Sequence, residues 1–178
     1  MAVFATLNAL PAADHPELMP AVVYEALRYV PSAKVITIDP EHADTETLVA
    51  VYDLPRQVMA NAVLVQGARA GEVRQACCMT LAHRRVDVNG AVRRKLDVRK
   101  CSFAPMDVAV AASGMEYGGI TPVGLPPEWP VWVDAAVADT EFLMIGAGNR
   151  TAKLILRGAE LLDLPGAERV EGLARDIG

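Results

Sequence analysis

Two apolar segments in the middle of the chain constrain its fold more than any other feature of the sequence. The segments 61–66 (NAVLVQ) and 73–82 are separated only by the turn-forming stretch 67–71, and this pattern predicts a β-hairpin. Consecutive strands in a hairpin pair antiparallel, whereas a doubly wound fold places a helix between successive strands. The sequence therefore predicts an α/β chain of the α+β type, in which helices pack around a mixed, mostly antiparallel sheet.

The rest of the chain consists of strand-like and helix-like stretches without an internal repeat or a linker. We expect strands at 34–38, 100–103, 131–133, 142–145 and 153–156. We expect helices at 16–29, 44–53, 88–96 and 105–114, and another that begins near 158. Residues 1–15 carry no feature that would anchor them. The prediction is a partly helical N-terminal extension at 1–32, followed by a single domain at 33–178.

Composition places the chain among ordinary globular domains. Its 178 residues are 52% hydrophobic and 22% charged, and a chain of this length can bury a core without disulfides or metal. No stretch of 18 apolar residues predicts a membrane span, and the N-terminus lacks the basic start of a secretory signal. The cysteines Cys77, Cys78 and Cys101 do not have zinc-site spacing. We therefore expect a cytoplasmic protein that uses no metal, no cofactor and no membrane.

Charge is distributed unevenly along the sequence. The formal net charge is −5, which argues against a protein that coats nucleic acid. Segment 84–100, however, holds seven basic residues against two acidic ones, so it carries +5 and the remainder carries −10. The basic residues are Arg84, Arg85, Arg93, Arg94, Lys95, Arg99 and Lys100. Such a cluster is typical of a nucleic-acid backbone contact, and also of a solvated protein face.

Segment 114–126 is rich in glycine and proline, with four glycines and two prolines in thirteen residues. Glycine lets backbone amides approach a ligand closely and point in one direction, and proline restricts the path of the loop. Such a loop could hold a carbonyl oxygen or an oxyanion on main-chain donors, and one donor of this kind contributes about 3 kcal/mol in acyl-transfer catalysis. The alternative is a tight structural connection between a helix and a strand.

A second glycine motif, 146–150 (GAGNR), follows directly after an apolar predicted strand. A strand followed by Gly-x-Gly is typical of dinucleotide sites, but Thr151 stands where the third glycine would be. The chain also ends before a second βαβ half could form. We interpret the motif as a sharp turn that lines a pocket and presents Arg150 to a ligand.

Two further candidates carry less specific signals. Cys101 and His83 could form a nucleophile–base pair, but no third residue is identifiable that would orient them, and a buried, inert thiol is more common in a strand. Asp134 ends a predicted strand just after the glycine-rich loop. Its carboxylate could bind the amine of a ligand or cap the next turn.

Three of these motifs together resemble one protein family. Segments 118–126 (GGITPVGLP), 130–134 (PVWVD) and 146–150 occur in an order and spacing similar to the YbaK/prolyl-tRNA-synthetase-associated-domain family. This family contains small trans-acting aminoacyl-tRNA deacylases and editing domains inserted in prolyl-tRNA synthetases. The resemblance covers about residues 33–172. It implies that 33–178 forms one YbaK-like editing domain with a barrel-like core.

The resemblance also implies an activity and a set of site residues. Members of the family hydrolyse, without a metal, the ester that joins a wrong amino acid to the 3′ end of tRNA, and a tRNA hydroxyl is taken to assist the water. The residues implied in catalysis are Gly118, Gly119, Thr121, Pro122 and Asn61, and those implied in substrate binding are Tyr117, Asp134, Gly146, Gly148 and Arg150. The basic residues of 84–100 are the expected contact with the tRNA acceptor end. An aminoacyl-tRNA synthetase and a second copy of the chain are further expected partners.

One position departs from the family pattern. The family has a pocket lysine at the start of the strand where this sequence has Asn61, and no lysine occurs between Lys34 and Lys95. Asparagine forms hydrogen bonds but has no charge to pair with a phosphate. Arg150 or Lys100 could supply that charge. The alternatives are a catalytically weakened or inactive module that binds aminoacyl-tRNA or an aminoacyl-like ligand, and a structural or regulatory partner of a synthetase.

Overall fold

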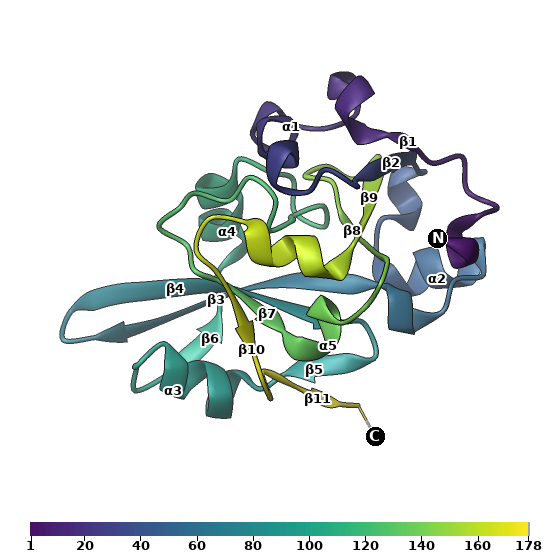
Figure 1. Cartoon of the computed structure of the whole chain (residues 1–178). Coiled ribbons are helices and arrows are strands. Elements are labelled where there is room, and N and C mark those ends of the chain that lie inside the picture. The colour runs from purple at the N-terminus through teal and green to yellow at the C-terminus, as the bar shows by residue number, and fades with distance from the viewer. Residues whose placement is uncertain (178) are drawn as a thin grey trace.

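The computed structural model describes residues 1–177 as short helices packed around β-sheets (Figure 1). The strands are β1 (Leu10–Pro11), β2 (Lys34–Thr37), β3 (Ala60–Arg69), β4 (Glu72–Leu81), β5 (Arg84–Val86), β6 (Cys101–Phe103), β7 (Val131–Asp134), β8 (Leu143–Gly146), β9 (Ala152–Leu156), β10 (Ala167–Val170) and β11 (Ala174–Asp176). The α-helices are α1 (Ala21–Ala26), α2 (Thr45–Tyr52), α3 (Arg93–Lys95), α4 (Met106–Ser113) and α5 (Ala135–Ala138). A π-helical turn, η7 (Val88–Val92), precedes α3, and 3₁₀ helices lie at Ala2–Phe4, Ala12–Asp14, Pro16–Leu18, Leu27–Tyr29, Pro40–His42, Arg56–Val58 and Gly158–Asp163.

Strands β3 and β4 form the predicted hairpin, and each is ten residues long. The turn consists only of Ala70 and Gly71, which have φ angles of 52° and 86°, as a tight two-residue hairpin turn requires. The expected turn at 67–71 is therefore too long, because Gly67 continues the strand. A Cβ atom at Gly67 would lie 2.5 Å from the carbonyl oxygen of Lys100, so this glycine permits close packing against the segment that leads into β6.

The strands form a five-stranded sheet in the order β10-β7-β4-β3-β6, a four-stranded sheet in the order β1-β2-β9-β8, and a pair of β11 with β5. Strand β7 runs parallel to β4 and β10, and the remaining pairs are antiparallel, which confirms the predicted mixed, mostly antiparallel sheet. A single parallel bridge between Met59 and Met144 joins the two larger sheets. Over residues 1–177 the large sheet does not close into a barrel, because the short strands β6 and β10 form its two edges and do not pair with each other.

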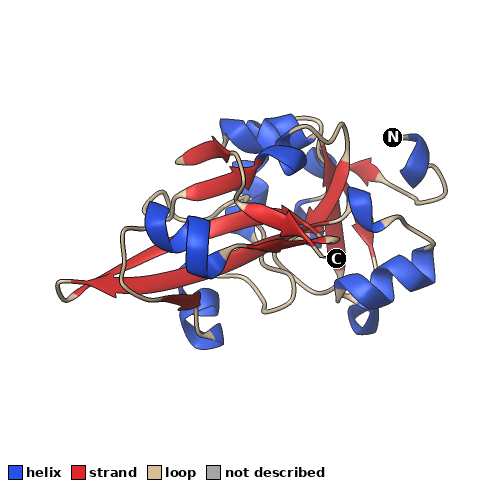
Figure 2. Ribbon diagram, turned by 90° about the horizontal axis from the view of Figure 1, so that it is seen from below, coloured by secondary structure: helices blue, strands red, loops and turns tan. Residues whose placement is uncertain are grey.

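The centre of the large sheet is buried on both faces, whereas the tip of the β3–β4 hairpin is exposed. Leu64 and Cys77 belong to a core cluster that includes side chains of α1, α4 and the helix Gly158–Asp163. Their neighbours Val65 and Cys78 belong to a different cluster, formed with η7 and the segment before β11. Helices accordingly surround the strands (Figure 2). The sheet is thus a rigid platform from which neighbouring loops can position a site.

The N-terminal residues pack into the fold, contrary to the expectation for 1–15. Phe4 is 1% exposed and lies in a third core cluster with Ile36, Leu48 and Met144. Leu10 in β1 pairs with Val35 in β2, which adds an edge strand to the smaller sheet. A single buried aromatic residue and a two-residue strand leave no periodic pattern, so sequence inspection does not detect this anchoring. The expected helix at 16–29 is also divided into α1 and two 3₁₀ helices.

Within residues 1–177, no helix combines the length and the apolar character needed to span a bilayer.

Candidate functional site

A cavity of about 320 Å³ lies where α2, the start of β3 and the hairpin of β8 and β9 meet. Its polar lining consists of Asp44, Thr45, Asn61, Tyr117 and Lys153. The glycines Gly118 and Gly146 contribute main chain to the wall, and Met59, Met144 and Ile145 contribute apolar surface. A volume of this order suits a small organic group, and the mixed lining supplies both apolar contacts and polar recognition.

Three segments that are far apart in the sequence contribute to this one cavity. Asn61 comes from the start of β3, Gly118 from the glycine-rich loop, and Gly146 from the end of β8. Glycine is required at Gly146 because a Cβ atom there would lie 2.3 Å from the carbonyl oxygen of Gly119. The amide of Gly148 also donates a hydrogen bond of 2.8 Å to that same oxygen. The two glycine motifs therefore form a single wall.

Arg150 does not line the cavity, but its side chain contacts the glycine-rich loop. Its guanidinium donates to the carbonyl oxygen of Pro40 at 2.8 Å, and its backbone amide donates to the carboxylate of Glu116 at 2.9 Å. An ideal Cβ atom on Gly118 would lie 2.5 Å from the Nη1 of Arg150, so the guanidinium rests against the loop. The predicted ligand-binding residue Arg150 is thus placed where it holds the loop in position.

Asn61 lies at the mouth of the cavity and is linked to the N-terminus of α2. The hydroxyl of Thr45 donates to the Oδ1 of Asn61 at 2.9 Å. Asp44 caps α2 by accepting hydrogen bonds from the amide of Thr47 at 3.0 Å and from its hydroxyl at 2.6 Å. These hydrogen bonds lower the pKa of Asp44, so the cavity contains a carboxylate at neutral pH.

Lys153 is a cavity residue that sequence analysis missed. It pairs with Gly146 across the β8–β9 hairpin, it is 6% exposed, and its Nζ donates to the carbonyl oxygen of Ala43 at 2.7 Å. Burial, with a further contribution from the charge of Arg150, lowers the pKa of Lys153 to about 8. Its position in the sequence could have identified it, because Lys153 is the one charged residue in the apolar stretch 152–156 and the chain has only four lysines.

Several predicted site residues lie outside the lining of this cavity. Thr121 is completely buried, and its amide donates to the Sδ of Met115 at 3.4 Å. Pro122 lines a different, apolar hollow between α1 and α4. Gly119 and Gly148 support the wall through their mutual hydrogen bond. These residues shape the loop that carries Gly118.

Asp134 does not line the cavity, and its carboxylate is bound by other groups of the protein. Its side chain is 1% exposed and forms an ion pair with the guanidinium of Arg84. It also accepts hydrogen bonds from the amide of Ala136 at 3.1 Å, which caps α5, and from the amide of Ala174 at 2.9 Å. The capping alternative for Asp134 thus agrees with the geometry, and the expected contact with a ligand amine does not.

Some basic side chains of segment 84–100 form hydrogen bonds or ion pairs with other residues, and others do not. Arg84 binds Asp134 and also donates to Asp176 at 3.0 Å, so it is unavailable for the expected contact with tRNA. Lys95 forms an ion pair with Glu168 at 2.7 Å. The Nε of Arg93 donates to the carbonyl oxygen of Asn89. The exposed side chains of Arg85, Arg94, Arg99 and Lys100 form no hydrogen bond or ion pair with any other residue of 1–177.

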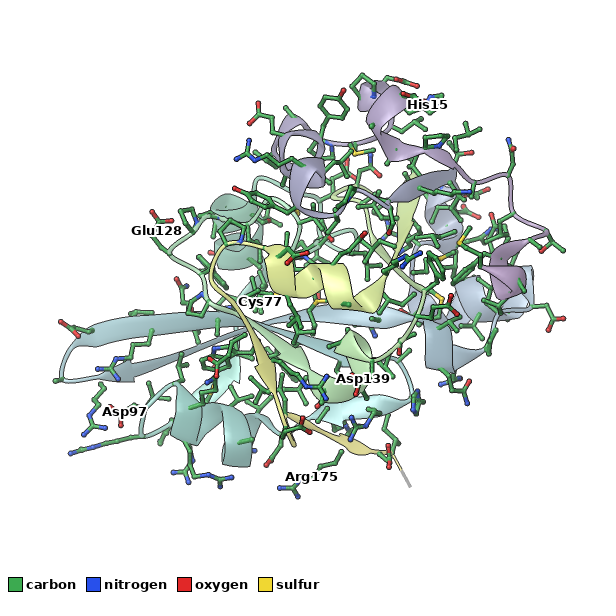
Figure 3. All side chains as sticks on the ribbon, in the orientation of Figure 1. His15, Cys77, Asp97, Glu128, Asp139 and Arg175 are labelled. Carbon is green, nitrogen blue, oxygen red and sulfur yellow. The ribbon has the colours of Figure 1, made fainter. Side chains whose placement is uncertain are left out.

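The structure separates Cys101 from His83. Cys101 pairs with Gly67 on β3, whereas His83 follows Leu81, which pairs with Ala60 seven residues away along the same strand. At about 3.3 Å per residue this is a separation of about 23 Å along the strand. Burial also raises the pKa of the Cys101 thiol, which is unfavourable for a nucleophile. A second cysteine, Cys77, is buried between strand β4 of the large sheet and the helices that cover it (Figure 3).

The fold and the cavity define a class: an α+β domain with a small polar site built on two glycine motifs. Residues 39–164 match the aminoacyl-tRNA editing domain family, and the chain belongs to this family. Comparison with functionally curated proteins gave no match.

Several solved structures share the fold of this chain. The hypothetical protein APE2540 superimposes with a TM-score of 0.74 at 19% identity, covering 86% of this chain and 99% of that one. A protein proposed to be a trans-editing enzyme for prolyl tRNA synthetase superimposes with a TM-score of 0.70 at 19% identity, covering 90% of this chain and 96% of that one. At this level of identity the likeness establishes the fold.

Proposed function

We propose that the protein is a trans-acting deacylase that hydrolyses the ester bond of mischarged aminoacyl-tRNA. The observation that carries this proposal is the convergence of Asn61, Gly118 and Gly146 on one cavity. Gly118 and Gly146 come from two motifs that resemble the editing family, and Asn61 stands where the family has its pocket lysine. Membership of the aminoacyl-tRNA editing domain family supports the same substrate class.

The lining of the cavity supports a reaction of this kind. A water oxygen attacks the ester carbonyl carbon, the bond from that carbon to the ribose oxygen breaks, and the ribose oxygen takes up a proton. Main chain at Gly118 and Gly146 lies in the wall without obstructing side chains, so the aminoacyl group can approach the backbone closely. The volume of about 320 Å³ favours a small amino acid with part of the terminal nucleoside.

The position of the free basic residues near one end of β3 supports a contact with the acceptor arm of the tRNA. Cys101, which directly follows Lys100, pairs with Gly67, and Gly67 lies six residues along β3 from Asn61. This corresponds to about 20 Å along the strand, a distance that a duplex RNA stem can span while its single-stranded end enters the cavity. We therefore assign Arg94, Arg99 and Lys100 to the contact with the RNA backbone.

A direct test is incubation of the protein with tRNAs mischarged with alanine, cysteine or serine. We expect release of at least one of these amino acids well above the rate in buffer, while correctly charged tRNA stays intact. Release no faster than in buffer across the panel would refute the enzymatic proposal.

A second candidate function is binding of aminoacyl-tRNA without hydrolysis, and the neutral Asn61 at the cavity mouth favours it. The variant Asn61→Lys discriminates between the two. If wild-type protein binds mischarged tRNA and only the variant hydrolyses it, the natural protein is a binding module. If wild-type protein already hydrolyses the ester, the binding-only alternative is refuted.

A further inference from the structure

Lys153 is the one lysine among residues 1–177 that is buried, and it lies in the wall of the cavity. The three other lysines, Lys34, Lys95 and Lys100, are at least partly exposed. Placing an ammonium group in the interior costs free energy unless polar partners replace the lost water. A buried lysine in a cavity wall therefore indicates either a structural partner or a ligand.

The structural partners of Lys153 are incomplete. Its ammonium has three N–H donors, and the carbonyl oxygen of Ala43 accepts one of them at 2.7 Å. Within residues 1–177, no carboxylate lies within ion-pair distance of the Nζ. Two donors are left for water or for a ligand in the cavity.

The surrounding charges favour an anion over a cation at this point. The guanidinium of Arg150 adds a second positive charge close to Lys153. Asp44 is the acidic residue in the cavity lining, and the amide and hydroxyl of Thr47 already occupy its carboxylate. The cavity lining itself contains one cation, Lys153, whose N–H donors are only partly used, and one carboxylate, Asp44, whose oxygens already accept hydrogen bonds. A negatively charged oxygen that enters the cavity therefore finds free donors at the Nζ.

We propose that Lys153, contributed by β9, is the residue that binds an anionic oxygen of the ligand inside the cavity. The identity of the ligand rests on the proposed function. In an aminoacyl-tRNA the anionic oxygen has two sources: the phosphate of the 3′-terminal nucleotide, and the oxyanion that develops on the ester carbonyl during attack by water. Lys153 thus supplies the positive charge that Asn61 cannot provide, from a different strand of the fold.

The first arm of the test measures binding. The probes are a non-hydrolysable 3′-alanylamino analogue of adenosine, with and without a 5′-phosphate. The variant Lys153→Met removes the charge but keeps a flexible apolar chain of similar length, and Lys34→Met, a half-buried lysine on the neighbouring strand β2, is the matched control. We expect wild-type protein and Lys34→Met to bind the phosphorylated probe about 10-fold more tightly than the other probe, and Lys153→Met to lose this preference.

The second arm measures single-turnover deacylation of the tRNA that the wild-type protein hydrolyses fastest. Loss of the phosphate preference in Lys153→Met, with the maximal rate retained, identifies the phosphate as the bound group. A maximal rate reduced by about 100-fold, with probe binding unchanged, identifies the developing oxyanion. If Lys153→Met matches wild type and Lys34→Met in both arms, the proposal is overturned.

The same experiment separates this proposal from the proposed function. If wild-type protein hydrolyses no mischarged tRNA but shows a phosphate preference that depends on Lys153, the anion site stands and the deacylase function fails. If no hydrolysis and no phosphate preference are found, both fail. NMR of ¹³C-labelled lysine provides a readout that does not depend on activity, since the phosphorylated probe should raise the pKa of Lys153 and leave that of Lys34 unchanged.

Discussion

The backbone amide of Gly148 donates a hydrogen bond of 2.8 Å to the carbonyl oxygen of Gly119, and this bond joins the two glycine motifs of the chain. The amide of Glu116 in turn donates to the carbonyl oxygen of Gly148 at 2.9 Å. The glycine-rich loop and the turn after β8 therefore behave as one unit. The shape of the cavity depends on how closely these two backbones approach each other.

Substitution of Gly146 tests this dependence. In Gly146→Ala the new Cβ would lie 2.3 Å from the carbonyl oxygen of Gly119 and 2.8 Å from that of Ile120, so the loop must move. We expect a loss of about 1–3 kcal/mol in unfolding free energy and at least a 10-fold loss of ligand affinity. Chemical denaturation and probe binding measure the two effects. Gly71→Ala is the control, because no atom lies within 4 Å of its Cβ; equal effects of both substitutions on ligand affinity would contradict the prediction.

The buried ion pair of Asp134 and Arg84 is predicted to stabilise the fold rather than to bind substrate. Asp134→Ala leaves the Nη1 group of Arg84 and the amides of Ala136 and Ala174 without the acceptor that they share. We expect a loss of about 3–5 kcal/mol in unfolding free energy, measured by urea denaturation. The exposed residue Asp163 provides a control, and its replacement by alanine should change stability by less than about 0.5 kcal/mol. An Asp134→Ala protein of normal stability with weakened substrate binding would restore the ligand-binding role.

The stability of the protein should depend on pH through Lys153. The pKa of this group is lowered from its ordinary value of 10.5 to about 8 in the folded state. Below pH 8 both states carry the proton, and the cost of burying the charge is fully present. Between pH 8 and 10.5 the unfolded state binds more protons than the folded state, so stability rises with pH.

The variant Lys153→Met lacks this titration. Relative to wild type it should be more stable at pH 7, by up to about 3 kcal/mol, and this difference should shrink as the pH approaches 10.5. Denaturation of both proteins at pH 7 and 10 gives the difference in their unfolding free energies at each pH. Groups that titrate equally in both proteins cancel in this difference. A stability difference that does not change with pH would show that the pKa of Lys153 is normal.

Binding of tRNA should depend on salt through the free basic residues. Removing one charge that neutralises an RNA phosphate is expected to reduce the slope of log affinity against log salt concentration by about 0.7–0.9. Neutralising Arg94, Arg99 and Lys100 together with glutamine should therefore reduce this slope by about 2–3. Neutralising Arg28, Arg56 and Arg157, which lie outside segment 84–100, removes the same charge and should leave the slope unchanged. A flat salt dependence for wild-type protein would show that the segment is only a solvated face.

The local elements of this protein follow directly from its sequence. The apolar segments 61–66 and 73–82 predicted β3 and β4, and the expected helices at 44–53 and 105–114 correspond to α2 and α4. These features depend on neighbours within a few residues, so a linear pattern contains the information. Gly67 was misinterpreted as part of a turn because its packing partner, the carbonyl oxygen of Lys100, lies 33 positions further along the chain.

The candidate site also combines features that the sequence specifies locally with features that depend on tertiary contacts. By itself the sequence determined the family, the two glycine motifs and the neutral residue Asn61, because each is a short motif at fixed spacing. Only the tertiary structure decided that Lys153 lies in the cavity and that Asp134 binds Arg84 instead of a ligand. Lys153 meets Ala43 across 110 residues, and Asp134 meets Arg84 across 50. Burial and charge pairing are properties of residues that the folded chain brings together, and no local pattern specifies them.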